Sequence, residues 1–142
     1  MFTSDTHKQL VVFSLGRDEY AFPIAHVREI VRYAEPRPVP SVERWVRGVI
    51  AVRGETLPVC DLAARLGATT GAAKIVIVDT DAGISGVIVD DVTEVVSVTA
   101  EQLRPASGSD AGLVAAVVTI DDRLVVVLDP NRIIGRPERA VA

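Results

Sequence analysis

The sequence is poor in cysteine and has no long apolar run, and each shortage excludes a class of protein. Cys60 is the one cysteine, so no internal disulfide can hold the fold together. The apolar runs are short, such as Leu10–Phe13 and Leu124–Leu128, whereas a membrane-spanning helix needs about 20 apolar residues. The polar stretch from Thr3 to Gln9 lies where a secretory signal would be apolar. We therefore expect a cytoplasmic protein without direct membrane insertion.

Aromatic residues and positive charge are also scarce. Aromatic residues make up 4% of the 142 residues. The chain has 15 Lys and Arg against 19 Asp and Glu, which gives a formal net charge of −4. Proteins that bind nucleic acids use Lys and Arg to contact phosphates and aromatic rings to stack on bases, so nucleic acid is not expected as a partner. The chain has no phosphate-binding Gly-Lys-Ser/Thr loop and no dinucleotide-binding glycine fingerprint, and we expect no cofactor.

Few residues are suited to nucleophilic catalysis. Such a site needs a Ser, Cys or Thr beside a base, and the two histidines are His7, near the terminus, and His26, which we expect at the surface. Cys60 is the best thiol candidate for an enzyme. It lies in an alternating pattern between Val59 and Asp61, where a small buried apolar residue is usual. This pattern favours an inert, buried thiol.

Acidic pairs could serve as general acid and base or as metal ligands. They are Asp79 with Asp81, Asp90 with Asp91, and Asp121 with Asp122. All lie at the ends of expected strands, where Asp is common because its side chain accepts hydrogen bonds from nearby backbone N–H groups. No Cys or His stands near them to complete a transition-metal site. We therefore expect turn residues here, and neither an enzyme nor a metal protein.

The chain repeats itself. Leu10–Val31 aligns without a gap with Ile75–Val96, and Val46–Gly67 aligns with Val114–Gly135. Apolar positions fall on apolar positions in both alignments, Glu29 falls on Glu94, and Asp and Gly residues also coincide. Such matching indicates a duplicated unit.

Each repeat predicts two β-hairpins followed by a short helix. Asp61 and Asp129 are suited to cap helices over Leu62–Leu66 and Pro130–Ile134, which Gly67 and Gly135 would end. The three prolines of Glu35–Pro40 predict an extended connector. The expected hairpins join Lys8–Leu15 to Glu19–Ile24, Val46–Val52 to Thr56–Cys60, Lys74–Asp79 to Ile84–Val89, and Val114–Ile120 to Arg123–Leu128.

The pattern predicts an all-β fold of two small barrels that form a single unit. We expect residues 9–70 to form one barrel and residues 71–137 the other, with approximate boundaries because strands can be exchanged between them. A half of this size buries too little surface to be stable alone, so the barrels should share a hydrophobic core.

The residues resemble the CheW-like family of chemotaxis coupling proteins over roughly residues 9–135. The resemblance rests on order and spacing along the whole chain, although each stretch alone would be weak. The stretches are Leu10–Leu15, Glu19–Ile24, Val27-Arg28-Glu29-Ile30, Val46-Arg47-Gly48-Val49-Ile50, Val52-Arg53-Gly54, Pro58-Val59-Cys60-Asp61-Leu62, Gly86–Asp90, Val92–Val98 and Thr99–Pro105.

This resemblance implies two SH3-like five-stranded β-barrels with a few short helices, and a non-catalytic scaffold. Its implied partners are the regulatory domain of a CheA-type histidine kinase, the cytoplasmic tips of chemoreceptors, and other CheW-like domains. A groove between the barrels would take the receptor, and the chain would be recruited to membrane-associated receptor arrays. Two alternatives stay open: an adaptor in a chemosensory pathway with another output, such as surface motility, and a small ligand-binding barrel.

Glu29 and Arg53 match a charged pair that the family uses near its coupling surfaces. The resemblance therefore implies a partner-binding site around these two residues. On the residues alone, a solvated face is the simpler interpretation of both. Ile30 would offer an apolar anchor, and Arg53 could fork to a carboxylate, either of Glu29 or of a partner. The chain departs from the family pattern at Ala51-Val52 and at a second-half strand position where a glycine is usual, which is Ala115 or Ala116 here. The expected partner-binding residues are Val27, Glu29, Ile30, Gly48, Arg53 and Gly54.

Overall fold

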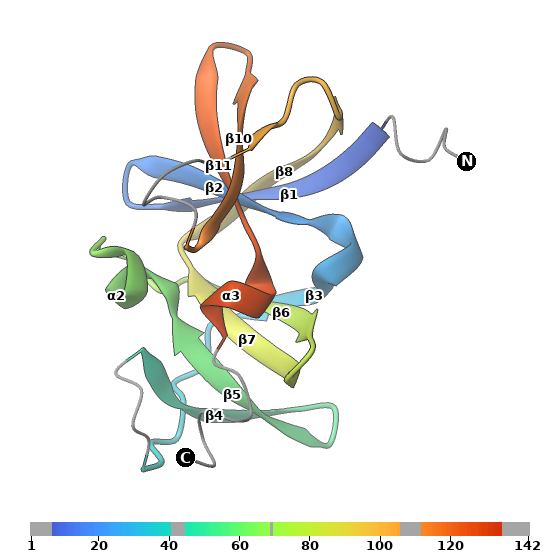
Figure 1. The fold of residues 1–142 in the computed structure, drawn as a ribbon. Coiled ribbons are helices and arrows are strands. Elements are labelled where there is room, and N and C mark those ends of the chain that lie inside the picture. Colours follow the sequence, from blue (N-terminus) through green and yellow to red (C-terminus); the bar gives the residue numbers. More distant parts are fainter. Residues whose placement is uncertain (1–6, 41–44, 69, 106–111, 135–142) are drawn as a thin grey trace.

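The computed structural model describes residues 7–40, 45–68, 70–105 and 112–134, and these residues form two β-sheets stacked along one axis (Figure 1). The strands of the first repeat are β1 (His7–Leu15), β2 (Asp18–Pro23), β3 (Val27–Arg32), β4 (Val46–Val52) and β5 (Glu55–Asp61). Those of the second repeat are β6 (Lys74–Thr80), β7 (Gly83–Val89), β8 (Asp91–Thr99), β9 (Arg104–Pro105), β10 (Val114–Ile120) and β11 (Arg123–Leu128). The helical elements are short: η1 (Ile24–His26), α2 (Leu62–Leu66) and α3 (Pro130–Ile133). None of the helices in these residues is long and apolar enough to cross a membrane.

All four expected hairpins are present, with boundaries within two residues of those predicted. The β1–β2 turn contains Gly16 at φ 61°, a left-handed conformation that glycine adopts without a steric penalty. Glu35–Pro40 contains no regular strand and makes one isolated bridge, as its prolines predict.

The two sheets do not follow the two repeats. One sheet has the strand order β8-β1-β2-β11-β10-β9, and the other has the order β3-β6-β7-β5-β4. We call them the β1 barrel and the β6 barrel after their central strands. The β1–β2 hairpin of the first repeat completes the sheet of the second, and the β6–β7 hairpin completes the sheet of the first. Residues 9–70 and residues 71–137 are thus each divided between the two barrels.

The exchange is reciprocal. The repeat places β1 on β6, β2 on β7, β3 on β8, β4 on β10 and β5 on β11. With this correspondence the two strand orders are the same except for β9, which is added at one edge. The parallel pairs that close the exchange also correspond, because β5 pairs with β7 and β11 pairs with β2. Apart from the short strand β9, both barrels are therefore built alike, each from three strands of one repeat and a hairpin of the other.

The β1 barrel has one strand more than the five expected, the two-residue β9. Arg104 and Pro105 pair with Val117 and Ala116 of β10. In the β6 barrel, Arg37 of the proline-rich connector bridges the strand β4 in the equivalent place. The backbones of Arg37 and Val49 exchange two hydrogen bonds there, of 2.8 and 2.9 Å. Proline has no N–H to donate to a β-ladder. Pro105 in β9, and Pro36 and Pro38 on either side of Arg37, therefore keep both of these backbone pairings short.

The central strands have apolar side chains on both faces, which explains their unbroken apolar runs. In β1, Leu10 and Val12 point into the β1 barrel, and Phe13 and Leu15 point toward the other barrel. In β6, Ile75 and Ile77 similarly point into the β6 barrel, while Val76 and Val78 face the first barrel. Each barrel has its own small core, and a third cluster lies between them.

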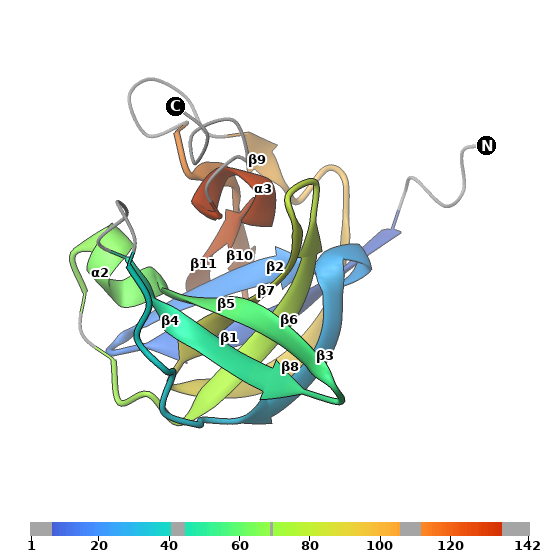
Figure 2. The ribbon, with the colours of Figure 1, turned by 90° about the horizontal axis from the view of Figure 1, so that it is seen from below.

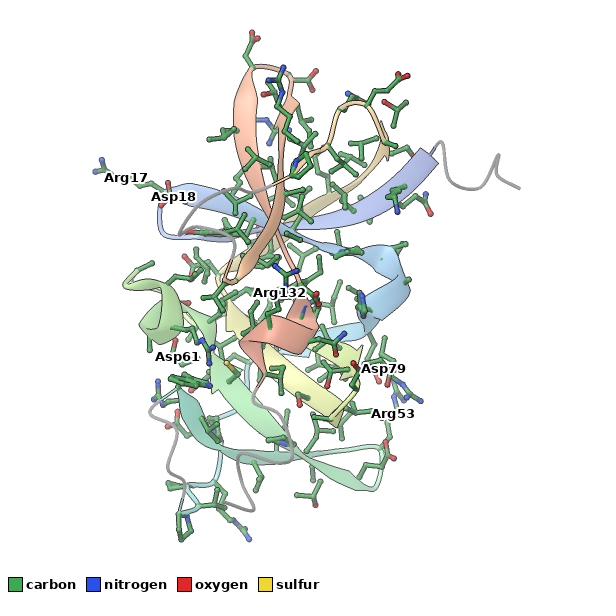
Figure 3. The ribbon with its side chains drawn as sticks, viewed as in Figure 1. Arg17, Asp18, Arg53, Asp61, Asp79 and Arg132 are labelled. Atoms are coloured by element: carbon green, nitrogen blue, oxygen red, sulfur yellow. The ribbon has the colours of Figure 1, made fainter. Side chains whose placement is uncertain are left out.

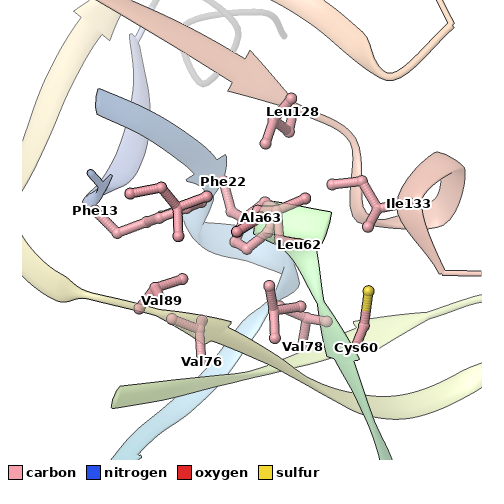
Figure 4. Close-up of a cluster of buried hydrophobic side chains, with 12 residues drawn as sticks. Phe13, Phe22, Cys60, Leu62, Ala63, Val76, Val78, Val89, Leu128 and Ile133 are labelled. Atoms are coloured by element: carbon pink, nitrogen blue, oxygen red, sulfur yellow. The ribbon is translucent and has the colours of Figure 1, made fainter. Parts of the chain in front are cut away.

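The cluster between the barrels confirms the predicted shared core, and Figure 4 shows it in close-up. Strands of both barrels and both α-helices contribute to it. Its buried members are Phe13, Leu15, Phe22, Cys60, Leu62, Ala63, Val76, Val78, Val87, Val89, Leu128 and Ile133.

Both α-helices begin at the expected caps. The Asp61 side chain accepts a hydrogen bond from the Ala64 N–H at 3.1 Å, and Asp129 accepts one from Asn131 at 2.9 Å. Gly67 ends α2 at φ 72°, whereas the residue predicted to end the second helix, Gly135, lies outside the described residues.

The helices also tie the two barrels together. The Asn131 side chain of α3, which follows the β1 barrel, accepts a hydrogen bond from the Asp81 N–H of the β6–β7 turn at 2.7 Å. The Arg65 guanidinium of α2, which follows the β6 barrel, donates to the Arg132 carbonyl at 3.3 Å. These contacts are consistent with a single folding unit.

Candidate partner-binding site

Glu29 and Arg53 form a bidentate ion pair that closes the β6 barrel. Arg53 Nη2 lies 3.0 Å from Glu29 Oε1, and Arg53 Nε lies 3.1 Å from Oε2. Glu29 is on β3, at one edge of the sheet, and Arg53 is at the tip of the β4–β5 hairpin, at the other edge. Figure 2 shows this tip curling round to reach β3. The pair thus joins two strands that share no backbone ladder.

Arg53 occupies a backbone conformation that its residue type disfavours. Its φ is 51°, and Gly54 follows at φ 83°, so the two residues form the left-handed turn that suits a two-residue hairpin loop. Asn, Asp or Gly is preferred at the first of these positions, because other side chains crowd the backbone there. An arginine at this position indicates that its charge and reach serve a purpose that outweighs the strain.

The pair is ionised at neutral pH. Hydrogen bonds from Arg53 are the largest effect and lower the pKa of the Glu29 carboxyl below its ordinary value. Desolvation opposes them and comes next in size, and the positive charges of Arg53 and Arg28 lower the pKa further. The same hydrogen bonds raise the pKa of Arg53. The Arg53 side chain is nevertheless 77% exposed, and Figure 3 shows it projecting from the molecule. Glu29 therefore holds the guanidinium in place while leaving much of its surface accessible.

Ile30 is the apolar neighbour of this pair. It lies on β3 directly after Glu29, with its backbone paired to Val76 of β6, and is 41% exposed. Val27 begins the same strand, but its side chain is half-buried against the shared core. On the outer side of the strand, Arg28 pairs with Asp79 at 3.5 Å. An exposed isoleucine on the strand that also holds a fixed charged pair has the composition of a protein-binding surface, which combines an apolar anchor with charge.

The two glycines of the expected site occupy different environments. Gly54 is exposed in the turn beside Arg53, and a Cβ there would meet nothing within 4 Å. Gly48 is buried at a bulge in β4 with φ 148°, and a Cβ built on it would lie 2.1 Å from the Arg37 carbonyl oxygen. Gly48 is therefore required for the connector to pack against β4. The structure brings Glu29, Arg53 and Gly54 together and places Gly48 beneath the connector. Ile30 follows Glu29 on β3, with its side chain on the opposite face of the strand.

The β1 barrel carries a corresponding ion-pair group that the sequence analysis did not identify. Arg123 lies 2.6 Å from Glu94, the equivalent of Glu29, and 2.8 Å from Glu19. The signal was the alignment of Glu94 with Glu29. It was missed because Arg123 is two positions beyond Asp121, the residue that aligns with Arg53. Val95, the counterpart of Ile30, is also exposed, at 53%.

The structure places the residues considered for catalysis in the core, in the 3₁₀ turn η1 and in a hairpin turn. Cys60 is 3% exposed, and burial raises the pKa of its thiol to about 12, so it is not a thiolate at neutral pH. His26 is half-buried, with Nδ1 3.2 Å from the Asp79 carbonyl oxygen. Asp121 and Asp122 form a turn at φ 50° and 69°. Within the described ranges, no three His, Cys, Asp or Glu side chains are grouped as a metal site requires.

Comparison with known proteins gives one consistent result. The family model "CheW-like domain" matches residues 9–138. The chemotaxis protein CheW of Thermotoga maritima is 32% identical over 92% of this chain and 91% of the relative. The CheW of Klebsiella aerogenes is 29% identical over 94% of this chain and 86% of the relative.

A solved structure agrees with these sequence matches. The crystal structure of the scaffolding protein TtCheW from Thermoanaerobacter tengcongensis superposes with a TM-score of 0.84 and 26% sequence identity, covering 96% of this chain and 94% of that one. The match includes both barrels, which are SH3-like. The family model matches most of the chain, and the fold and the repeated strand order agree with it. This chain therefore belongs to the CheW-like domain family.

Proposed function

We propose that this chain, a non-catalytic chemotaxis scaffold of the CheW family, couples chemoreceptors to a CheA-type histidine kinase through the exposed end of the β6 barrel. The observation that supports this most directly is the Glu29–Arg53 pair. It fixes a largely exposed guanidinium against the strand that also carries the exposed Ile30, and it does so from a turn whose backbone conformation is unfavourable for arginine.

The chemistry of this end suits a protein partner with an apolar patch and an acidic side chain. Ile30 would insert into the apolar patch. Arg53 retains N–H groups beyond those directed at Glu29, and these can donate to a carboxylate of the partner. Because Glu29 already restrains the guanidinium, less side-chain entropy is lost on binding than with a free arginine.

The regulatory domain of the kinase is the partner that we assign to this surface. Receptor tips and other CheW-like domains are further partners in the same assembly, and their binding would recruit the chain to membrane-associated arrays. The receptor is assigned to the region between the barrels, where the α-helices and the shared core meet.

The test is binding of the purified chain to the regulatory domain of a CheA-type kinase encoded in the same genome, measured by calorimetry. Ile30→Asp should weaken binding by roughly tenfold or more, because it places a charge in the apolar contact. Val39→Asp is the matched control, since Val39 is 40% exposed but lies on the connector. If both variants bound as tightly as the unmodified chain, the assignment of the interface to the β6 barrel would be wrong. If the unmodified chain did not bind at all, the proposed function would be overturned.

A further inference from the structure

The chain crosses between the barrels at two equivalent places, and only one crossing is held firmly. The first crossing leads from β2 to β3 through η1 (Ile24–His26), and the second leads from β7 to β8 through Asp90. The repeat aligns Ala25 with Asp90, so an alanine stands in the first crossing where an aspartate stands in the second.

Asp90 fastens its crossing to two other segments. Its carboxylate accepts hydrogen bonds from the Gly16 N–H at 2.7 Å, from the Thr70 hydroxyl at 2.6 Å, and from the Gly71 N–H. Gly16 belongs to the β1–β2 turn, and Thr70 and Gly71 lead into β6. One side chain therefore fixes the second crossing against both barrels.

Within the part of the chain that the structure describes, no side chain ties the first crossing to two other segments in this way. Its single 3₁₀ turn contains no buried residue, and no side chain caps its N-terminus. Ile24 is 39% exposed, and His26 Nδ1 lies 3.2 Å from the Asp79 carbonyl oxygen. Pro23, just before it, already has an extended backbone at φ −57° and ψ 136°. A 3₁₀ turn of this length contributes little stability. Extending it would cost the His26 contact and the packing of the turn against β1 and β6.

The β1–β2 hairpin, which precedes the first crossing, pairs with strands of the second repeat. The strand β1 pairs with β8, and β2 pairs with β11. A second copy of the chain presents the same β8 and β11, and the same shared core behind them. If the hairpin moved to that copy, every one of these pairings would be made again between the two molecules.

We propose that two copies of this chain form a dimer by exchanging their β1–β2 hairpins, with η1 extended so that β2 and β3 become continuous. The exchange already present between the two repeats is thereby extended to two molecules. The dimer would display two copies of the Glu29–Arg53 surface, which raises the avidity for an assembly of repeated partners. The exchange requires no partner protein. A failure of this proposal would therefore leave the proposed coupling function intact, and the reverse also holds.

An engineered disulfide distinguishes the exchanged dimer from any other dimer. Gln9 on β1 and Ser97 on β8 are directly opposite each other and exposed. In the variant Gln9→Cys with Ser97→Cys, the bond links one chain to itself in the monomer and two chains in the exchanged dimer. The protein is unfolded, refolded at millimolar concentration and oxidised. We expect a doubled mass by light scattering and a covalent dimer on a denaturing gel without reductant.

A matched pair serves as the control. Ala51 and Thr56 are opposite each other within the β4–β5 hairpin, so Ala51→Cys with Thr56→Cys gives a link within one chain in either form. Cys60 does not interfere when oxidation follows refolding, because it is then buried. A chain that stays monomeric after concentrated refolding would overturn the proposal, as would a dimer in which the Gln9–Ser97 link remains within one chain.

A change in the length of the crossing gives a second, independent readout. Deletion of Ala25 shortens the crossing so that the hairpin reaches its own barrel less readily, and the dimeric fraction should rise several-fold. If the deletion variant does not fold, the refolding of the unmodified chain still decides. An unchanged dimeric fraction in a folded deletion variant would count against η1 as the hinge.

Discussion

The Arg53 guanidinium meets the Glu29 carboxylate across the seam where the β6 barrel closes, with Nη2 3.0 Å from Oε1. The two residues lie on opposite edges of a five-stranded sheet, so this contact exists only when the sheet has curled. Both side chains are accessible to solvent, and exposed ion pairs contribute little to stability. The contact therefore serves mainly to position Arg53.

Reversal of one charge in this pair should impair binding far more than folding. Arg53→Glu places two carboxylates face to face and removes the donor for a partner, so we expect affinity for the kinase regulatory domain to fall by roughly tenfold or more. The midpoint of urea unfolding should change little. Calorimetry and urea titration measure the two effects.

The combined variant Glu29→Arg with Arg53→Glu separates positioning from direct contact. It restores the seam but exchanges the sign of the exposed charge. Persisting loss of affinity would mean that Arg53 contacts the partner, whereas full recovery would mean that only closure of the barrel matters.

Gly48 should be essential for folding. In Gly48→Ala, the new Cβ would lie 2.1 Å from the Arg37 carbonyl oxygen, at a backbone φ of 148° that alanine disfavours. We expect a loss of about 3 kcal/mol in the free energy of unfolding, measured by urea denaturation. Gly54→Ala is the control, because its Cβ meets nothing and only the left-handed conformation costs about 1 kcal/mol. Similar losses in both variants would contradict the packing role of Gly48.

Asp90 should make stability dependent on acid pH. Partial burial raises the pKa of its carboxyl, but the hydrogen bonds from Thr70, Gly16 and Gly71 outweigh burial and lower it below the ordinary value of 3.8. The folded chain therefore holds the proton less tightly than the unfolded chain. The stabilisation is complete above the unfolded pKa and is lost as the pH falls through the folded pKa.

Urea titrations of the unmodified chain and of Asp90→Asn test this dependence. The unmodified chain should be the more stable at pH 7, and the difference should shrink as the pH falls below about 4. A difference that stays constant down to pH 2 would show that the Asp90 carboxylate is not the stabilising group.

Cys60 should be unreactive in the folded chain. Burial leaves the thiol 3% exposed and raises its pKa to about 12, so almost no thiolate is available at pH 8. Alkylation should be slow in the native protein and fast in denaturant, as followed by mass spectrometry. Rapid native alkylation would show that the shared core opens readily around this residue.

The sequence by itself determined the elements that depend on neighbouring residues. The hairpins follow from alternating apolar residues and turn residues, and the caps follow from Asp61 and Asp129, whose side chains bond the backbone two or three residues ahead. The burial of Cys60 follows from its place in an apolar strand. These features require no knowledge of the remote parts of the chain.

Only the tertiary structure decided the features that join distant segments. Glu29 meets Arg53 across a closed seam, Gly48 is buried beneath Arg37, and Arg123 reaches Glu94 although the alignment pairs other residues. The exchange of hairpins is of the same kind. The repeats are similar enough that either hairpin has the apolar pattern to complete either sheet, and the pattern does not state which sheet receives it. The choice is made by the packing of β1 and β6 on both faces, which is a property of the whole core.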